Sequence, residues 1–149
     1  MESIFSPAYF IHLTSQYIKN YAQQTVRELG NFNITPEQYG ILFMLSKEDG
    51  LYQRQFSKAL MKDRPNITRM LDVLEKKKLV ERAKEATDKR ISKVYITKAG
   101  RKFVEETEPV KQKIREEIVS PLSKDEQETL MVLLEKIRNN MEKHVQIQI

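Results

Sequence analysis

The chain has 149 residues without a single cysteine, and 40% of its residues are hydrophobic. This content suffices for one compact domain and excludes a disordered tail, while the lack of cysteine excludes a disulfide scaffold and a thiolate zinc site. No apolar run reaches the roughly 18 residues that a membrane-spanning helix needs. Because acidic Glu2 stands where a signal peptide carries positive charge, we expect a cytoplasmic protein.

The positive charge is concentrated in the middle of the sequence. Residues 51–103 carry 16 basic and 6 acidic side chains, a net charge of +10, although the whole chain carries only +5. The flanking segments are neutral to acidic. A segment this cationic favours a polyanion, such as nucleic acid, as its partner. The alternative is that lysine and arginine only keep a helical surface soluble.

Four helix starts are legible in chain order. Ser6-Pro7 places a capping serine before a proline at the first helical position, and Thr35-Pro36-Glu37-Gln38 is a capping box. Asp63 caps the third start, and Ser123-Lys124-Asp125-Glu126 is a second capping box. Apolar residues at helical spacing follow these starts: Phe10, Leu13, Tyr17 and Tyr21; Tyr39, Leu42 and Phe43; Ile67, Leu71 and Leu74; Leu130, Leu133, Leu134, Ile137, Met141 and Val145.

A further short helix is predicted over residues 52–60, although Tyr52 is a poor capping residue. Its apolar side consists of Phe56, Ala59 and Leu60.

Two short strands are predicted after this helical region. Val80–Ala83 and Val94–Thr97 have strand-like sequences, and a polar loop over residues 84–93 joins them. Thr97 leads into a long helix, which Pro109 should kink or leave with one unpaired carbonyl. This order of elements is that of a winged helix-turn-helix domain: mainly α, with a small β-hairpin as the wing, and with further helices at both ends.

The second helix of such a motif enters the major groove of DNA, where its first residues meet base edges. Here that helix starts after Asp63, and its apolar positions must face the core. The residues left on the open side are Arg64, Asn66, Thr68 and Arg69. Arginine and asparagine suit guanine and adenine edges, and threonine suits a phosphate or the thymine methyl group. For Asn66 and Thr68, the alternative is a first-turn residue favoured only by capping.

The loop between the strands is the second part of the expected site. Its basic residues are Lys84, Lys89, Arg90 and Lys93. Arginine at a hairpin tip suits a narrow minor groove with strong negative potential. Asp88 is close enough in sequence to accept a hydrogen bond from Arg90 and hold its guanidinium group. The alternative is a plain hairpin turn at Thr87-Asp88.

Two segments resemble the MarR family of bacterial transcription regulators. Asp88-Lys89-Arg90 with Val94-Tyr95-Ile96-Thr97-Lys98-Ala99-Gly100 resembles the family's wing signature, an Asp-x-Arg before a strand that ends in Leu-Thr-x-x-Gly. Asn66-Ile67-Thr68-Arg69, with Leu71, Leu74-Glu75-Lys76-Lys77 and Leu79-Val80, resembles its recognition helix and the exit from it. The resemblance covers nearly the whole chain.

Three residues depart from the family pattern. Ile96 replaces the usual leucine, Lys78 replaces a glycine after the recognition helix, and Tyr52 replaces a capping threonine or serine. We expect the first to be harmless and the second to strain or reshape the helix end.

The resemblance implies a homodimer in which the first, fifth and sixth helices interlock. It implies one domain over residues 1–149, with DNA binding in 33–100 and dimerisation in 1–32 and 101–149. The residues favour a dimer independently, because long apolar stripes on the terminal helices would otherwise stay exposed. These stripes contain Phe10, Leu13, Tyr17, Ile114, Ile118, Leu134, Ile137 and Met141. The alternative is a monomer whose terminal helices fold back.

We therefore predict a transcription regulator, specifically a repressor, that binds an inverted-repeat operator as a homodimer. The resemblance also implies release by a small aromatic or anionic effector. His12, Gln16, Tyr39 and Phe43 could line its cleft, although core packing explains each of them.

Two other functions are weighed. One is an architectural protein that binds DNA without sequence preference or effector control. The other is a small enzyme, which is not expected because the sequence lacks a glycine-rich phosphate loop and a nucleophile elbow. His12 and His144 lie too far apart for a local metal motif, so neither a metal nor a cofactor is expected.

Overall fold

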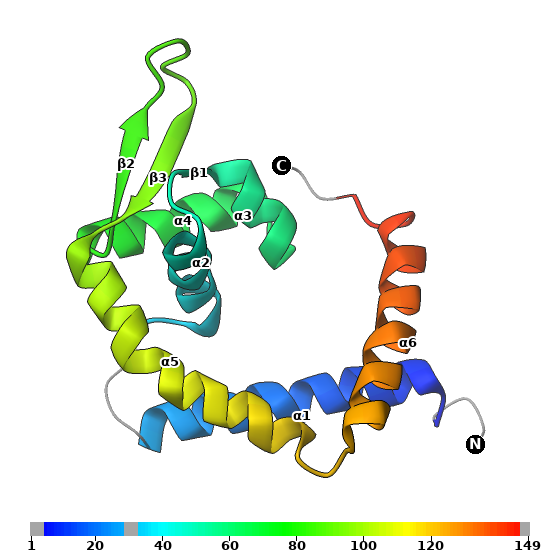
Figure 1. Ribbon diagram of the computed structural model, residues 1–149. Coiled ribbons are helices and arrows are strands. Elements are labelled where there is room, and N and C mark those ends of the chain that lie inside the picture. Colours follow the sequence, from blue (N-terminus) through cyan, green and yellow to red (C-terminus); the bar gives the residue numbers. More distant parts are fainter. Residues whose placement is uncertain (1–4, 29–32, 147–149) are drawn as a thin grey trace.

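The computed structural model describes residues 5–28 and 33–146, and it has a winged lobe joined by one long helix to a second group of helices (Figure 1). The chain forms, in order, α1 (Pro7–Glu28), α2 (Pro36–Lys47), β1 (Leu51–Tyr52), α3 (Gln53–Leu60), α4 (Arg64–Lys76), β2 (Val80–Lys84), β3 (Ser92–Ile96), α5 (Lys98–Val119) and α6 (Lys124–Glu142). The predicted mainly helical fold with a small hairpin is therefore confirmed. Residues 1–4, 29–32 and 147–149, which belong to the expected dimerisation region, lie outside the described residues.

The helices begin where the capping residues predict. The side chain of Thr35 accepts the N–H of Gln38 at 3.2 Å, and the Gln38 side chain accepts the N–H of Thr35 at 3.0 Å. The second predicted capping box, at the start of α6, forms the same pair of hydrogen bonds. Asp63 accepts the N–H of Asn66 at 2.9 Å at the start of α4. These side chains satisfy backbone N–H groups that have no partner within the helix.

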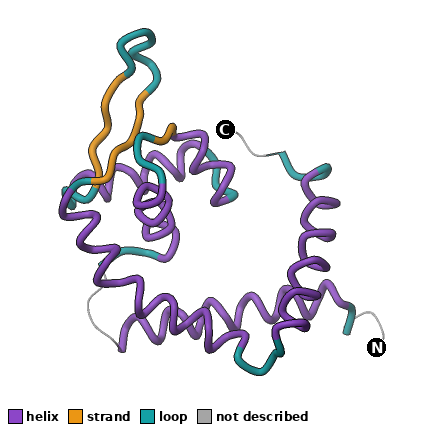
Figure 2. Tube along the Cα trace, in the orientation of Figure 1, coloured by secondary structure: helices purple, strands orange, loops and turns teal. Residues whose placement is uncertain are grey.

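The sheet has three antiparallel strands in the order β1–β3–β2, and β2 and β3 form the wing (Figure 2). The hairpin is predicted correctly, but β3 begins at Ser92 and ends before Thr97. Thr97 leaves the strand because its side chain accepts the N–H of Gly100 and so caps α5. The sequence pattern does not predict β1, since two residues are too few to show strand alternation.

The core lies where α2, α3, α4 and one face of the sheet meet. Val94 and Ile96 are buried while Tyr95 between them is exposed, as their alternation predicts. Each buried aliphatic side chain contributes about 1.5–3 kcal/mol, so these contacts hold the winged lobe together. Ala59, predicted on the apolar side of α3, is exposed, and Phe56 is buried. The helices supply these fully buried residues: Ile41, Leu42, Leu45, Phe56, Ile67, Leu71 and Leu74.

The end of α4 contains the departure at Lys78. The N–H of Leu79 donates to the carbonyl of Leu74, and the N–H of Lys78 donates to the carbonyl of Glu75, both at 2.9 Å. This is the Schellman pattern, which needs one left-handed residue. Lys78 adopts that conformation with φ of 60°. The turn that suits glycine is therefore kept, and the lysine is strained within it.

The terminal helices form a second group beyond the winged core. α5 starts in the winged lobe, where Val104 is buried, and continues past Pro109 as one helix until it lies beside α1 (Figure 1). No side chain of α6 is buried. Ile114 of α5 is buried within the subunit, so it does not belong to the exposed stripe that the sequence predicts. Among the helices of the described ranges, none combines the length and hydropathy needed to cross a membrane.

Candidate DNA-binding surface

The first turns of α4 bring the four predicted contact residues together with different degrees of freedom. Arg64 and Arg69 are exposed, whereas Asn66 and Thr68 are half-buried. Ile67 is fully buried in the core, and this fixes the side of α4 that faces outward. The two arginines are therefore the residues of this set with the most freedom to reach a ligand.

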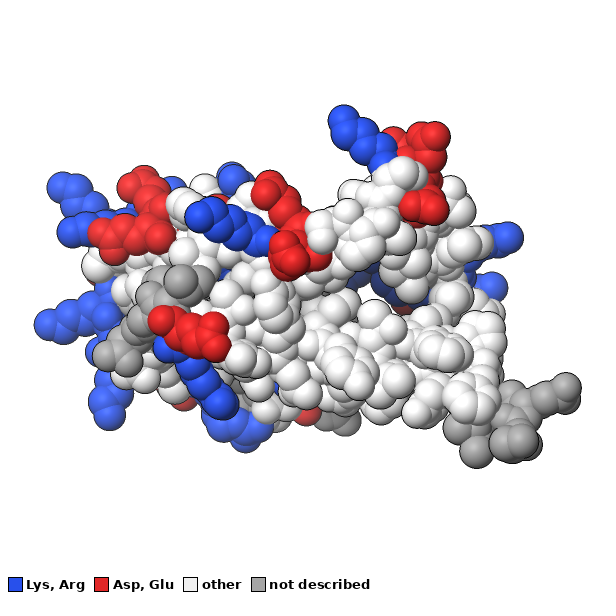
Figure 3. Space-filling model, turned by 90° about the horizontal axis from the view of Figure 1, so that it is seen from below, with Lys and Arg blue, Asp and Glu red and all other residues white. Residues whose placement is uncertain are grey.

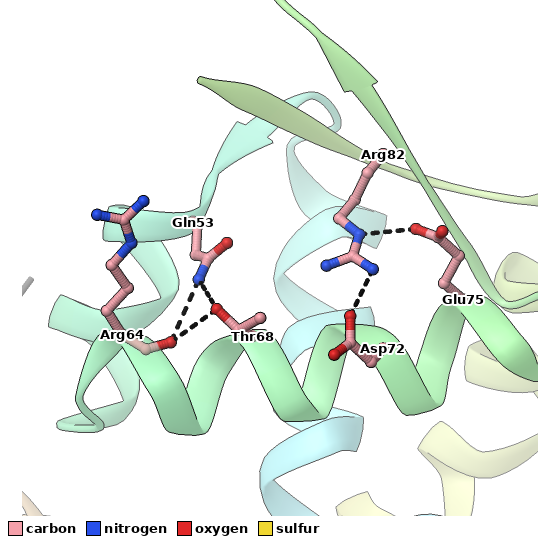
Figure 4. A network of polar contacts seen from close by, with 6 residues as sticks. All are labelled: Gln53, Arg64, Thr68, Asp72, Glu75 and Arg82. Carbon is pink, nitrogen blue, oxygen red and sulfur yellow. Dashed lines mark hydrogen bonds and ion pairs between the residues drawn. The ribbon is translucent and has the colours of Figure 1, made fainter. Parts of the chain in front are cut away.

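Thr68 is held inside the helix-turn-helix (Figure 4). Its hydroxyl donates to the carbonyl of Arg64 at 2.9 Å and accepts a hydrogen bond from Nε2 of Gln53 at 2.5 Å. Gln53 also donates to the carbonyl of Arg64 at 3.2 Å. The start of α3 is thus joined to the first turn of α4. Sequence reasoning missed Gln53, because a single glutamine at a helix start carries no recognisable spacing toward α4.

Asn66 and Arg69 form one unit on the outer face of α4. Nη2 of Arg69 donates to Oδ1 of Asn66 at 2.6 Å. The cap of α4 is the Asp63 side chain, which accepts the N–H of Asn66. The Asn66 amide therefore orients an exposed arginine instead of capping the helix.

The tip of the wing holds the predicted pair of Asp88 and Arg90. The Arg90 guanidinium group donates from Nε and Nη2 to the two Asp88 carboxylate oxygens at 3.1 and 3.2 Å, and the Arg90 N–H donates to the same carboxylate at 3.0 Å. Hydrogen bonds from the Arg90 side chain, and then from its backbone, hold the pKa of Asp88 below its ordinary value. The Arg90 side chain remains 89% exposed. It is therefore oriented and still open to solvent.

Lys93 lies on the stem of the wing and not at its tip. Its Nζ atom is 3.7 Å from Oε1 of Glu85. Lys89 is exposed beside the Asp88–Arg90 pair. Between the wing, α3 and the start of α4 lies a groove of about 370 Å³, and Arg54, Arg64 and Arg90 contribute to its lining. Sequence reasoning missed Arg54, which points to the surface only once α3 has been placed.

Arg82 joins the wing to the far end of α4 (Figure 4). Its Nε atom donates to Glu75 at 2.7 Å, and its Nη2 atom donates to Asp72 at 2.5 Å. These two hydrogen bonds neutralise Arg82, so it adds little to the cationic surface. Sequence reasoning missed this contact, because β2 was considered only as part of the hairpin. Within the described ranges, no group of three or more His, Asp and Glu side chains is placed to hold a metal ion.

Comparisons with known proteins agree with this geometry. A model of the MarR family matches residues 32–91. The transcriptional regulator HosA of Escherichia coli O127:H6 is 28% identical over 128 residues, which cover 86% of this chain and 93% of HosA. MepR of S. aureus in complex with DNA is 32% identical with a TM-score of 0.81, over 91% of this chain and 98% of MepR.

A mutant of E. coli MarR has been solved with and without operator DNA. The complex matches with a TM-score of 0.79 and 29% identity over 91% of this chain and 95% of MarR. The same mutant without DNA matches with a TM-score of 0.69 and 30% identity over 90% and 97%. Both the winged lobe and the helices around it are shared, and the chain therefore belongs to the MarR family of winged helix-turn-helix transcription regulators.

Proposed function

We propose that the protein is a repressor that binds an inverted-repeat operator as a homodimer. The observation that carries this proposal is the position of the recognition helix and the wing tip on either side of one groove. The proposed major-groove contacts are Arg64 and the Asn66–Arg69 unit, and Thr68 supports them through the Arg64 carbonyl. The proposed minor-groove element is the wing tip, where Arg90 is oriented by Asp88 and accompanied by Lys89. Lys93 supports the wing at its stem.

The proposed dimer uses the terminal helices. Leu134, Ile137 and Met141 on α6 are 41%, 43% and 46% exposed, and Tyr17 on α1 is 69% exposed. Apolar stripes of this length are typical of an interface. Figure 3 views the molecule from below and shows a broad area without Lys, Arg, Asp or Glu side chains between charged clusters. We assign residues 33–100 to DNA binding and residues 1–32 and 101–149 to dimerisation.

The arrangement of the two lobes favours the same proposal. The structure is more similar to the DNA complex of the MarR mutant than to the DNA-free form, by TM-scores of 0.79 and 0.69. A two-fold axis through the terminal helices would relate two recognition helices, so half-site centres should lie about one helical turn, or roughly 10 base pairs, apart.

A pocket of about 220 Å³ between α1, α2 and α5 is the proposed effector site. Arg27 and Lys111 contribute cations to its lining, and Phe103 and Val26 contribute apolar walls. The hydroxyl of Thr107, which also lines the pocket, is buried without a hydrogen-bond partner among the described residues. Such a lining suits a small carboxylate with an apolar body.

Lys111 is the residue that tests this pocket. Burial, and then the nearby Arg115, lowers the pKa of Lys111, so a bound anion would stabilise its charged form. Small aromatic acids should raise the melting temperature of the wild type and not of Lys111→Met. Lys113→Met, two residues along on the exposed side of α5, is the matched control. Equal shifts in all three proteins would contradict the assignment.

Sequence specificity is tested with DNA chosen by the protein itself. Wild-type protein selects duplexes of about 30 base pairs, enough for two half-sites, from a random pool. Fluorescence anisotropy then compares the selected duplex with a scrambled one. We expect the selected duplex to bind at least about 10³-fold more tightly, as in specific complexes generally. Equal affinities would favour the architectural alternative.

A further inference from the structure

Tyr52 occupies the residue before α3, where a capping side chain would normally lie. Its side chain makes no hydrogen bond to the helix backbone. The only capping contact is the reverse one, in which Oε1 of Gln55 accepts the N–H of Tyr52 at 2.8 Å. The first turn of α3 therefore lacks a stabilising interaction that threonine or serine would supply. A residue that gives up this interaction invites the question of what its side chain contacts.

The tyrosine reaches the stem of the wing. Its hydroxyl donates to Oε1 of Glu85 at 3.1 Å, immediately after β2. Nζ of Lys93 on β3 lies 5.2 Å from the centre of the Tyr52 ring and 3.7 Å from the same Glu85 oxygen. One side chain from the start of α3 thus contacts both strands of the hairpin, through a charge-assisted hydrogen bond and a cation–π contact.

The other neighbour of the ring belongs to the groove. The guanidinium carbon of Arg54 lies 5.4 Å from the centre of the Tyr52 ring. Tyr52 and Arg54 both line the groove that also receives Arg64 from α4 and Arg90 from the wing. The ring therefore lies where the helix-turn-helix and the wing must keep a fixed spacing.

We propose that Tyr52 is a positioning residue for DNA binding, which fixes the angle of the wing relative to α3 and α4 through Glu85 and Lys93. This inference rests on the proposed DNA-binding function. A two-stranded ribbon has little stability of its own. If the stem could tilt freely, Arg90 and Arg64 would have to be ordered separately on DNA, and that ordering would weaken binding.

The first experiment needs no DNA. Hydrogen exchange is followed at the Glu85 amide, which donates to the carbonyl of Ile91 within the wing. Tyr52→Phe and Tyr52→Thr should each speed this exchange severalfold, while amides of the helical core keep their wild-type rates. Tyr95→Phe is the matched control, because it removes a hydroxyl from an exposed tyrosine of β3. It should leave the Glu85 amide unchanged.

The second experiment separates positioning from stability. Tyr52→Thr restores the cap of α3 but loses every contact with the wing, whereas Tyr52→Phe keeps the ring and loses only the hydroxyl. On the selected duplex, Tyr52→Phe should bind about fivefold more weakly, the effect of one lost hydrogen bond to a carboxylate. Tyr52→Thr should bind still more weakly and yet melt no lower than Tyr52→Phe. Affinity and stability would then follow opposite orders.

A double-mutant cycle identifies the partner. The losses of affinity in Tyr52→Phe and Glu85→Ala should be non-additive if one hydrogen bond causes both. The proposal is overturned if Tyr52→Phe changes neither wing exchange nor affinity, or if affinity falls only in step with melting temperature. A wild-type protein that binds no duplex would refute the proposed function, and the exchange rates would still decide the role of Tyr52.

Discussion

The α carbon of Gly100 lies so close to the carbonyl oxygen of Leu79 that a Cβ atom on Gly100 would be 2.3 Å from that oxygen. The same carbonyl accepts the N–H of Thr97 at 3.1 Å, and the Thr97 hydroxyl donates to the carbonyl of Lys78 at 2.7 Å. The start of α5 is thereby fitted directly against the turn that ends α4. Only glycine leaves room for this contact.

Gly100→Ala should therefore destabilise the protein. The new methyl group must displace backbone, as in an overpacked core, so we expect the free energy of unfolding to fall by about 1–3 kcal/mol. Urea unfolding followed by circular dichroism measures the change. Lys98→Ala, an exposed substitution in the same first turn, is the control. An unchanged midpoint for Gly100→Ala would contradict the close approach.

Lys78→Gly should have the opposite effect. Lysine is strained at φ of 60° and glycine is not, so we expect a gain of about 0.5–1 kcal/mol in the free energy of unfolding. Lys77→Gly removes the same charge from the adjacent residue, where φ is −78°, and should be destabilising. The two variants are compared by thermal melting. Equal shifts would mean that the conformation of Lys78 carries no strain.

Arg69→Ala should weaken binding to the selected duplex by about 1–3 kcal/mol without unfolding the protein. The reason is that Arg69 is exposed, oriented by Asn66, and placed on the outer face of α4. Arg138→Ala removes the same charge from α6 and should bind normally. Gel shifts measure affinity, and circular dichroism confirms folding. Wild-type affinity in Arg69→Ala would remove this residue from the proposed site.

The Asp88–Arg90 pair should behave as one unit. Arg90→Ala should lower DNA affinity, Asp88→Ala should lower it because the guanidinium group loses its orientation, and the double variant should lose little more than Arg90→Ala alone. Since the pKa of Asp88 is lowered, the pair is fully formed at neutral pH and is lost only as the pH falls through that lowered pKa. Additive losses would mean that Asp88 does not orient Arg90.

Charges on α6 should separate the proposed dimer. Leu134→Asp combined with Ile137→Asp would bury unpaired charge between subunits, which costs several kcal/mol, and tight binding to the full inverted repeat should be abolished. Asn139→Asp with Asn140→Asp adds the same charge at two polar positions of α6 as a control. Sedimentation measures the oligomeric state. A wild-type protein of monomer mass that binds a half-site as tightly as the full repeat would contradict the dimer.

The elements that the sequence predicts well are those whose signals are local. Thr35, Asp63 and Ser123 each act on a backbone N–H three residues away, so the helix starts follow from spacing alone. The Asp88–Arg90 contact is predictable for the same reason. Gln53 and Thr68 are 15 residues apart, and no local pattern indicates that α3 and α4 bring them together.

The helix α5 has a mechanical consequence for regulation. Its 22 residues give it a length of about 33 Å, so tilting one end by about 10° moves the other by roughly 6 Å. Because Gly100 seats its first turn directly on the end of α4, little of such a rotation would be absorbed at that joint. α5 would act as a lever, and a displacement of a few ångströms at its far end would turn the recognition helix out of register with the groove.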